Sequence, residues 1–144
     1  LEFRRVLFRS VEYKGDLICR CLHGPSGEFI LTDAPTDNQG QGRYFSPTDL
    51  VGTALASCVL TIMGIIARRD GVDISGTRAT VHKEMAASPL RRIARLQMEI
   101  AFPALKALPP EFQRKLRNAA DTCPVRQSLH PDVKFEINFT EFYD

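Results

Sequence analysis

The stretch SPTDLVGTALASCVLTIMGIIARRDG, residues 46–71, decides the fold of this chain. Ser46 precedes Pro47 and lies three residues before Asp49, an arrangement typical of a helix that starts with a serine N-cap and a capping-box acid. Apolar residues then recur at spacings of three and four, which predicts a buried helix that ends at the closing Asp-Gly pair. Cys58 belongs to the predicted apolar stripe, whose members are Val51, Ala54, Leu55, Cys58, Val59, Ile62, Ile65 and Ile66.

Strand patterns flank this helix on both sides. Residues 15–22 and 28–32 surround a His-Gly-Pro-Ser-Gly turn and predict a hairpin. The polar segment 34–45 predicts a wrapping loop between this hairpin and the helix. Residues 77–85 and 92–102 predict a second hairpin, whose second strand is expected to point alternate side chains inward, namely Ala94, Leu96, Met98, Ile100 and Phe102.

The C-terminal third of the chain predicts two more helices and a strand. A Pro-Pro-Glu sequence opens a helix that runs to about residue 121, and Cys123 is placed as the N-cap of a short helix over residues 124–129. Residues 133–140 alternate between apolar and polar, which predicts a strand with one buried face. The order of elements predicts an α+β fold, with an antiparallel sheet packed on a long central helix.

Composition restricts the classes of function. With 144 residues, of which 44% are hydrophobic and 25% charged, the chain is expected to form a single soluble domain. A formal net charge of +2 argues against binding to nucleic acid or to an anionic membrane surface. The most apolar stretch, residues 50–67, contains Thr53, Ser57 and Thr61, so we expect a buried helix and no segment that crosses a membrane.

The first ten residues are expected to stand apart from the domain. Residues 1–10 lack an initiating Met and carry three arginines without the apolar centre of a secretory signal, so we interpret them as a vector remnant and place the domain at residues 11–144. Four cysteines without a secretory signal favour a reducing compartment, and hence a cytoplasmic protein.

Two of the four cysteines have a sequence context that suggests chemistry. At the start of a helix, Cys123 is expected to have a lowered pKa, and Arg126 would add a cation in the first helical turn. The alternative is that Cys123 is a small cap or packing residue. Cys58, taken alone, fits a core residue better than a nucleophile, and it would need a nearby cation to be reactive; the candidates are Lys14, Arg20, Arg43 and Arg126.

The remaining residues that could bind a metal or act as a general base do not form a recognisable site. Cys19, Cys21 and His23 share one side of a predicted strand, but neighbours on that side are about 7 Å apart, too far for three residues to hold one ion. We therefore expect no metal and treat these thiols as core residues. His82 and His130 lack the partners of a catalytic triad.

Several motifs together resemble the OsmC/Ohr superfamily. The likeness extends over nearly all of residues 11–144. It includes both Cys58 and Cys123, each with its neighbouring residues. The matching segments are Thr32-Asp33-Ala34-Pro35, Ser46-Pro47-Thr48-Asp49-Leu50, Ala56-Ser57-Cys58, Gly76-Thr77-Arg78, Cys123-Pro124-Val125 and Ser128-Leu129-His130-Pro131.

The resemblance implies an intertwined homodimer in which two sheets enclose the central helices and the active sites lie at the subunit interface. It further implies a thiol-dependent peroxidase of the oxidative stress response that works without a cofactor. Cys58 would attack an organic hydroperoxide and become a sulfenic acid, and Cys123 would resolve it as a disulfide. A dithiol reductant, small or carried by a protein, would then restore both thiols.

Two supporting positions depart from the pattern of the organic-hydroperoxide members. Those proteins have a Glu at the position of Thr48, paired with an Arg from an early strand, and Lys14 is the nearest equivalent of that Arg here. Lys cannot reproduce the two-pronged hydrogen bonding of Arg, and Asp49 can serve as a helix cap alone. The alternative function is therefore a non-catalytic OsmC-like protein that binds a hydrophobic small molecule at the dimer interface.

Overall fold

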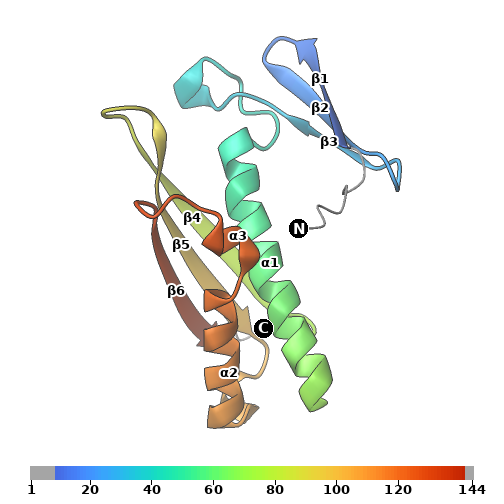
Figure 1. Ribbon diagram of the computed structural model, residues 1–144, viewed down its shortest axis with the longest axis vertical. Coiled ribbons are helices and arrows are strands. Elements are labelled where there is room, and N and C mark those ends of the chain that lie inside the picture. The colour runs from blue at the N-terminus through green and yellow to red at the C-terminus, as the bar shows by residue number, and fades with distance from the viewer. Residues whose placement is uncertain (1–8, 142–144) are drawn as a thin grey trace, which may run out of the picture. The chain divides into compact units, whose positions relative to one another are not determined.

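Two three-stranded sheets and three α-helices make up the part of the chain that the computed structural model describes, residues 9–141 (Figure 1). The chain divides into two compact units, one up to Leu50 and one from Val51 onward. The α+β class is as predicted, but the strands form two sheets, and only one of them is purely antiparallel.

The N-terminal unit contains an antiparallel sheet in the order β1-β2-β3, formed by β1 (Arg9–Gly15), β2 (Ile18–His23) and β3 (Phe29–Thr32). The hairpin of β2 and β3 agrees with the prediction. The run expected at residues 15–22 does not begin as a strand, because Asp16 and Leu17 both adopt positive φ and turn the chain between β1 and β2.

The first strand begins earlier than residue 11. Arg9 pairs with His23 and Ser10 pairs with Leu22, so these two residues, expected to belong to a remnant, are part of β1. The rest of the expected remnant, residues 1–8, lies outside the described residues.

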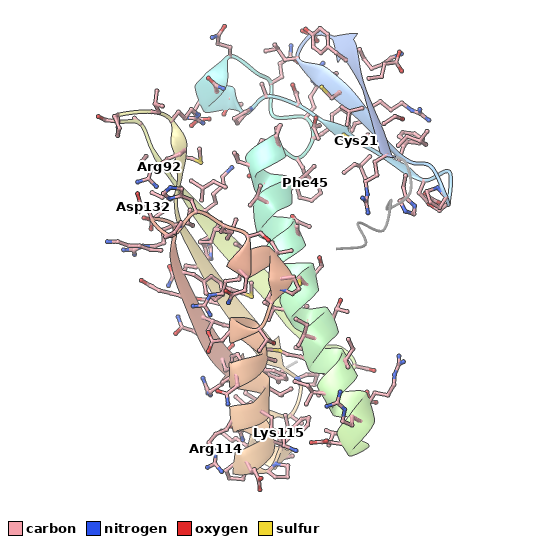
Figure 2. All side chains as sticks on the ribbon, viewed as in Figure 1. Cys21, Phe45, Arg92, Arg114, Lys115 and Asp132 are labelled. Carbon is pink, nitrogen blue, oxygen red and sulfur yellow. The ribbon has the colours of Figure 1, made fainter. Side chains whose placement is uncertain are left out.

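This unit leaves much apolar surface exposed. Val11 and Tyr13 are 66% and 64% exposed, and they pair across β1 and β2 with Cys21 and Cys19 (Cys21 is labelled in Figure 2). Within residues 9–50, the buried side chains are Thr32, Asp33 and Ser46, none of which is apolar. A small sheet without a buried apolar face of its own is only marginally stable.

An ion pair ties the wrapping loop to this sheet. Arg43 donates from Nε to Asp33 Oδ2 at 2.8 Å and from its backbone N–H to the same oxygen at 3.1 Å. Its other guanidinium nitrogens donate to the side chain and the backbone oxygen of Asp16, at 3.0 and 3.1 Å. The hydrogen bond from Arg43 lowers the pKa of the buried Asp33 carboxyl below its ordinary value of 3.8. Loop residue Arg43 therefore joins the end of β3 to the β1–β2 turn.

Helix α1 (Pro47–Asp70) starts and stops as predicted. The backbone N–H of Ser46 donates to Asp49 Oδ2 at 2.8 Å, and the N–H of Asp49 donates to Ser46 Oγ at 3.1 Å, which is the predicted capping box. Gly71 adopts φ +68 directly after the last helical residue, where a residue with a side chain would be strained.

The buried stripe of α1 is narrower than predicted. It consists of Gly52, Leu55, Val59, Met63 and Ala67, whereas Ala54 and Ile65 are exposed and Cys58 is half-buried beside it. A helix that packs on a single sheet buries one row of residues three or four apart, and the remaining apolar residues stay outside it. By length and composition, α1 is also apolar enough to cross a bilayer, which corrects the expectation that no segment is. The core helix of a soluble protein meets the same two criteria.

The C-terminal unit is built around a second sheet, β4-β5-β6 (Figure 1). β4 (Arg78–Ala86) and β5 (Arg92–Phe102) form the predicted hairpin, and β6 (Lys134–Glu141) pairs with β5 in parallel. Alternate residues of β5 from Leu96 to Phe102 are buried, as the alternation predicts. The parallel pairing was not predicted, because the direction of β6 depends on the crossover through α2 and α3.

Helices α2 (Pro110–Asp121) and α3 (Pro124–Gln127) form that crossover, with a short 3₁₀ turn, η2 (Leu105–Ala107), ahead of them. The apolar face of α2 is buried as predicted through Phe112, Leu116 and Ala119. Lys115, labelled in Figure 2, binds Asp70 at the end of α1 with a 2.7 Å hydrogen bond. The core of the unit therefore consists of α1, α2 and the inner face of the sheet.

We predict that the Asp33–Arg43 pair makes stability depend on acid. Because the folded pKa of Asp33 is lowered, its contribution is present above about pH 4, the ordinary carboxyl range, and is lost as the pH falls through the folded pKa. Asp33→Asn should lower the urea unfolding midpoint at pH 7, and this difference should shrink at about pH 3. Glu12→Gln, in an exposed pair with Lys14, is the matched control and should change little at either pH. An Asp33→Asn deficit that is the same at both pH values would contradict the prediction.

Candidate functional site

Cys123 lies between two helices and is completely buried. Thr122 ends α2, and Cys123 is the N-cap of α3, as the sequence predicts. Its backbone N–H donates to the carbonyl of Ala120 at 3.4 Å, and its carbonyl accepts from the N–H of Gln127 at 3.0 Å. With 0% exposure of Cys123 and buried alanines before it, the thiol is held within the core.

Cys58 reaches the same place from α1. It is half-buried, lies beside the buried residues Leu55 and Val59, and packs against the core cluster that includes Cys123. The Cys58 side chain is near enough to the Cys123 thiol to contribute to raising its pKa. The fold therefore brings together two thiols that are 65 positions apart, the difference between 123 and 58.

The pKa of Cys123 moves in the opposite direction from the sequence prediction. Burial raises the pKa above its ordinary value of 9.0, and the hydrogen bond with Cys58 raises it further. The backbone N–H groups of Arg126 and Val125 act to lower the pKa, but the sulfur makes no cap hydrogen bond of ordinary geometry with α3. A single helical turn thus provides too little stabilisation of the thiolate to offset its desolvation.

The guanidinium of Arg126 binds Asp121 and Phe135. It forms an ion pair with Asp121 and lies over the ring of Phe135, 4.6 Å from the ring centroid. These residues line a surface hollow of about 380 Å³ together with Gln127, Leu129, His130, Pro131 and Val133. The sequence places Arg126 in the first turn of α3 but does not reveal Phe135 as its partner, because that contact joins separate elements.

The other predicted supporting residues belong to the N-terminal unit. Lys14 pairs with Glu12 at 3.0 Å, Thr48 hydrogen-bonds the hydroxyl of Ser46 at 3.1 Å, and Asp49 completes the capping box. Arg43 was one of the four cations considered as activators of Cys58. In the structure it instead forms an ion pair with Asp33. The sequence analysis did not predict this pair, although Asp33 belongs to the Thr32-Asp33-Ala34-Pro35 motif at the end of a strand.

Cys19 and Cys21 occupy alternate positions of β2, as predicted, and both are free thiols. Across the described part of the chain, no cluster of three or more His, Cys, Asp or Glu side chains is arranged to hold a metal ion.

We predict that Cys123 titrates above the range of an ordinary cysteine. Because its folded pKa is raised, the thiol should stay neutral at pH 8 and become a thiolate only above its ordinary value of 9.0. The pH midpoint of its alkylation by iodoacetamide, followed by peptide mass spectrometry, should lie above that of the same protein unfolded in guanidinium. In Cys58→Ala the midpoint should move down but stay above the unfolded value, because burial is the larger cause. Equal midpoints in folded and unfolded protein would contradict the assignment.

Comparisons with known proteins place this chain in a family. The family model described as OsmC-like protein matches residues 40–138. A crystal structure from Psychrobacter arcticus 273-4, of a protein assigned to osmotic stress induction and the detoxification response, is 46% identical, with a TM-score of 0.87 and coverage of 96% of this chain and 99% of that one.

More distant structures share the fold. An organic hydroperoxide resistance protein OsmC from Legionella pneumophila is 13% identical, with a TM-score of 0.73 and coverage of 94% and 98% of the two chains. An organic hydroperoxide resistance protein from Elizabethkingia anophelis is 10% identical, with a TM-score of 0.73 and coverage of 96% and 99%. A search of the curated proteins found no match. On the family match over residues 40–138 and the 46% identity across almost the whole chain, the protein belongs to the OsmC-like protein family.

Proposed function

We propose that this protein is a thiol-dependent peroxidase that reduces organic hydroperoxides through Cys58 and Cys123. The observation that carries the proposal is that the half-buried Cys58 packs against the core cluster that contains the fully buried Cys123. Two of the structurally similar proteins are named for organic hydroperoxide resistance, and their shared fold supports a redox role.

The proposed reaction needs no metal or organic cofactor. The Cys58 thiolate attacks the O–O bond, becomes a sulfenic acid and releases an alcohol. Cys123 then displaces the sulfenic oxygen as water and forms a Cys58–Cys123 disulfide. A dithiol reductant reverses the disulfide by exchange, which returns both thiols. The packing of Cys58 against the core cluster that contains Cys123 supports the formation of this disulfide.

The difference in exposure between the two cysteines supports the proposed order of events. A hydroperoxide can reach a half-buried sulfur but not one with 0% exposure, so Cys58 is the attacking thiol and Cys123 the resolving thiol. Apolar neighbours of Cys58 on α1, including Leu55 and Ile62, favour organic hydroperoxides over hydrogen peroxide. In this proposal the protein acts in the cytoplasm, in the oxidative stress response, and binds neither nucleic acid nor membrane.

We predict that hydroperoxide consumption depends on Cys58. Wild type should consume cumene or tert-butyl hydroperoxide in the presence of a dithiol, and Cys58→Ser should lose at least about 99% of the rate because its hydroxyl is a weak nucleophile. One equivalent of hydroperoxide should produce a Cys58–Cys123 disulfide by peptide mass spectrometry.

Cys21→Ser is the matched control, since it removes a thiol from β2 and should leave the rate unchanged. If wild type and Cys58→Ser consume hydroperoxide equally, and no disulfide forms, the protein is instead a non-catalytic module that binds a hydrophobic small molecule.

We also propose that the working form is a homodimer. The exposed side of α1 carries no charge over three turns, with Thr53, Ala54, Ser57, Thr61 and Ile65 on it. The hydroxyls of Ser57 and Thr61 donate to the carbonyls of Ala54 and Ser57, at 3.1 and 2.7 Å, so they need no water. Small uncharged residues allow close helix contact, and a second copy presents the same surface. The exposed apolar sheet of the N-terminal unit supports the same conclusion.

The dimer is expected to depend on this face of α1. Sedimentation should give twice the chain mass of 16.2 kDa. Ala54→Glu should weaken association at least about tenfold, because it places a charge in an apolar contact. Asn118→Glu, on the exposed side of α2, is the matched control and should leave the mass unchanged. A monomeric wild type, or one that sediments with lipid vesicles, would overturn this proposal.

A further inference from the structure

We propose that a hollow at the C-terminal end of α1 binds a free amino acid with an apolar side chain, with Arg68 for its carboxylate and Asp73 for its ammonium group. The site is separate from the proposed peroxidase function, because neither Cys58 nor Cys123 lines it.

The hollow lies between the last turns of α1 and the loop that leads to β4 (Figure 1). Its volume of about 390 Å³ falls within the range of about 300–1,000 Å³ that is typical of pockets for small molecules. Its apolar lining belongs to the core or packs against it, and consists of Leu60, Ala67, Val72 and Ile74. The hollow can therefore remove an apolar side chain of a ligand from water.

Hydrogen bonds fix the loop side of the hollow. The backbone N–H of Val72 donates to the carbonyl of Ala67 at 2.9 Å, which ties the loop to the end of α1. The hydroxyl and the backbone N–H of Thr77 both donate to the carbonyl of Ile74, at 2.6 and 3.1 Å. A ligand would thus meet a wall that is already ordered, so little conformational entropy of the loop would be lost on binding.

Gly64 keeps the helix side of the hollow open. It lies in the interior of α1, where glycine is less favourable than alanine. A Cβ at this position would meet no atom within 4 Å, so no contact among the described residues requires a glycine here. The absence of a side chain instead leaves free the space that a ligand would occupy.

Two opposite charges line the hollow without forming an ion pair with each other. Arg68 and Asp73 are both exposed, and across residues 9–141 the guanidinium of Arg68 has no ion-pair partner. The backbone N–H of Ser75 donates to Asp73 Oδ1 at 2.8 Å, and hydrogen bonding with the side chain and backbone of Ser75 lowers the pKa of Asp73. The hollow therefore presents a held carboxylate and an unpaired guanidinium, which one ligand can bridge.

The two charges and the apolar lining define the chemical class of the ligand. An α-amino acid carries a carboxylate, an ammonium group and a side chain on one carbon, so it offers one group to each part of the hollow. Guanidinium and carboxylate groups form strong charge-assisted hydrogen bonds, and the partial negative charge at the C-terminal end of α1 adds to the attraction of Asp73 for an ammonium group. An apolar acid or an apolar amine would leave either Asp73 or Arg68 without a partner.

The test is a titration followed in the amide NMR spectrum of the full chain, with three ligands of similar shape. These are L-leucine, isocaproate, which lacks the ammonium group, and L-leucinamide, which lacks the carboxylate. Leucine should shift the amide signals of Gly64 and Gly76 to saturation, with a Kd of about 1 mM or tighter. Each analogue should bind about tenfold more weakly, because it loses one hydrogen-bonded charge pair.

Two variants should each affect only the ligands that carry the matching group. Arg68→Gln should weaken leucine and isocaproate about tenfold and leave leucinamide unchanged. Asp73→Asn should weaken leucine and leucinamide by the same factor and leave isocaproate unchanged. The unaffected ligand in each case shows that the hollow is intact. Arg69→Gln removes the same charge from the next residue, which does not line the hollow, and as the matched control it should change none of the three affinities.

A lack of saturation with leucine at about 10 mM would overturn the proposal. It would also be overturned if isocaproate or leucinamide bound as tightly as leucine, or if Arg68→Gln or Asp73→Asn weakened all three ligands equally. An effect of Arg69→Gln as large as that of Arg68→Gln would contradict the assignment of the carboxylate to Arg68. None of these measurements involves Cys58 or a hydroperoxide, so their outcome does not depend on the peroxidase proposal.

Discussion

The packing of α1 on the inner face of the second sheet is the constraint on which the site depends. Gly52 faces the sheet closely: a Cβ there would lie 3.3 Å from Val81 Cγ1, so Val81 would have to shift by a few tenths of an ångström to admit it. The row from Gly52 to Ala67 is buried, and Cys58 sits one position beside it. That offset leaves Cys58 half-buried and packed against the core cluster that contains Cys123.

Burial outweighs helix electrostatics at Cys123. An N-cap position and a nearby Arg normally favour a thiolate, but α3 has only one turn and the Arg126 guanidinium is bound by Asp121 and Phe135. The desolvation of a completely buried sulfur is the larger effect, so the two thiols differ in kind. Cys58 is half-buried, whereas Cys123 is completely buried and has a raised pKa.

The two units have different sources of stability. The C-terminal unit has its own apolar core, formed by α1, α2 and one face of a sheet. The N-terminal unit buries no apolar side chain within residues 9–50 and relies on strand pairing and on the Arg43 bridge between Asp33 and Asp16. A segment of this kind is stabilised chiefly by what covers it, which agrees with the homodimer proposed above.

Local signals in the sequence predicted most of the elements, and its motifs indicated the family that the comparisons then showed. Caps, turn residues and apolar spacing predicted α1 and α2 with their boundaries and the β2–β3 and β4–β5 hairpins, because these signals act over a few residues, but β1 was not predicted as a separate strand. Cys58 and Cys123 were singled out by their motifs. Tertiary structure alone decided that β6 runs parallel to β5, that Arg126 turns to Phe135, and that the pKa of Cys123 rises. These features depend on contacts between residues far apart in the chain, and on burial, which no local pattern encodes.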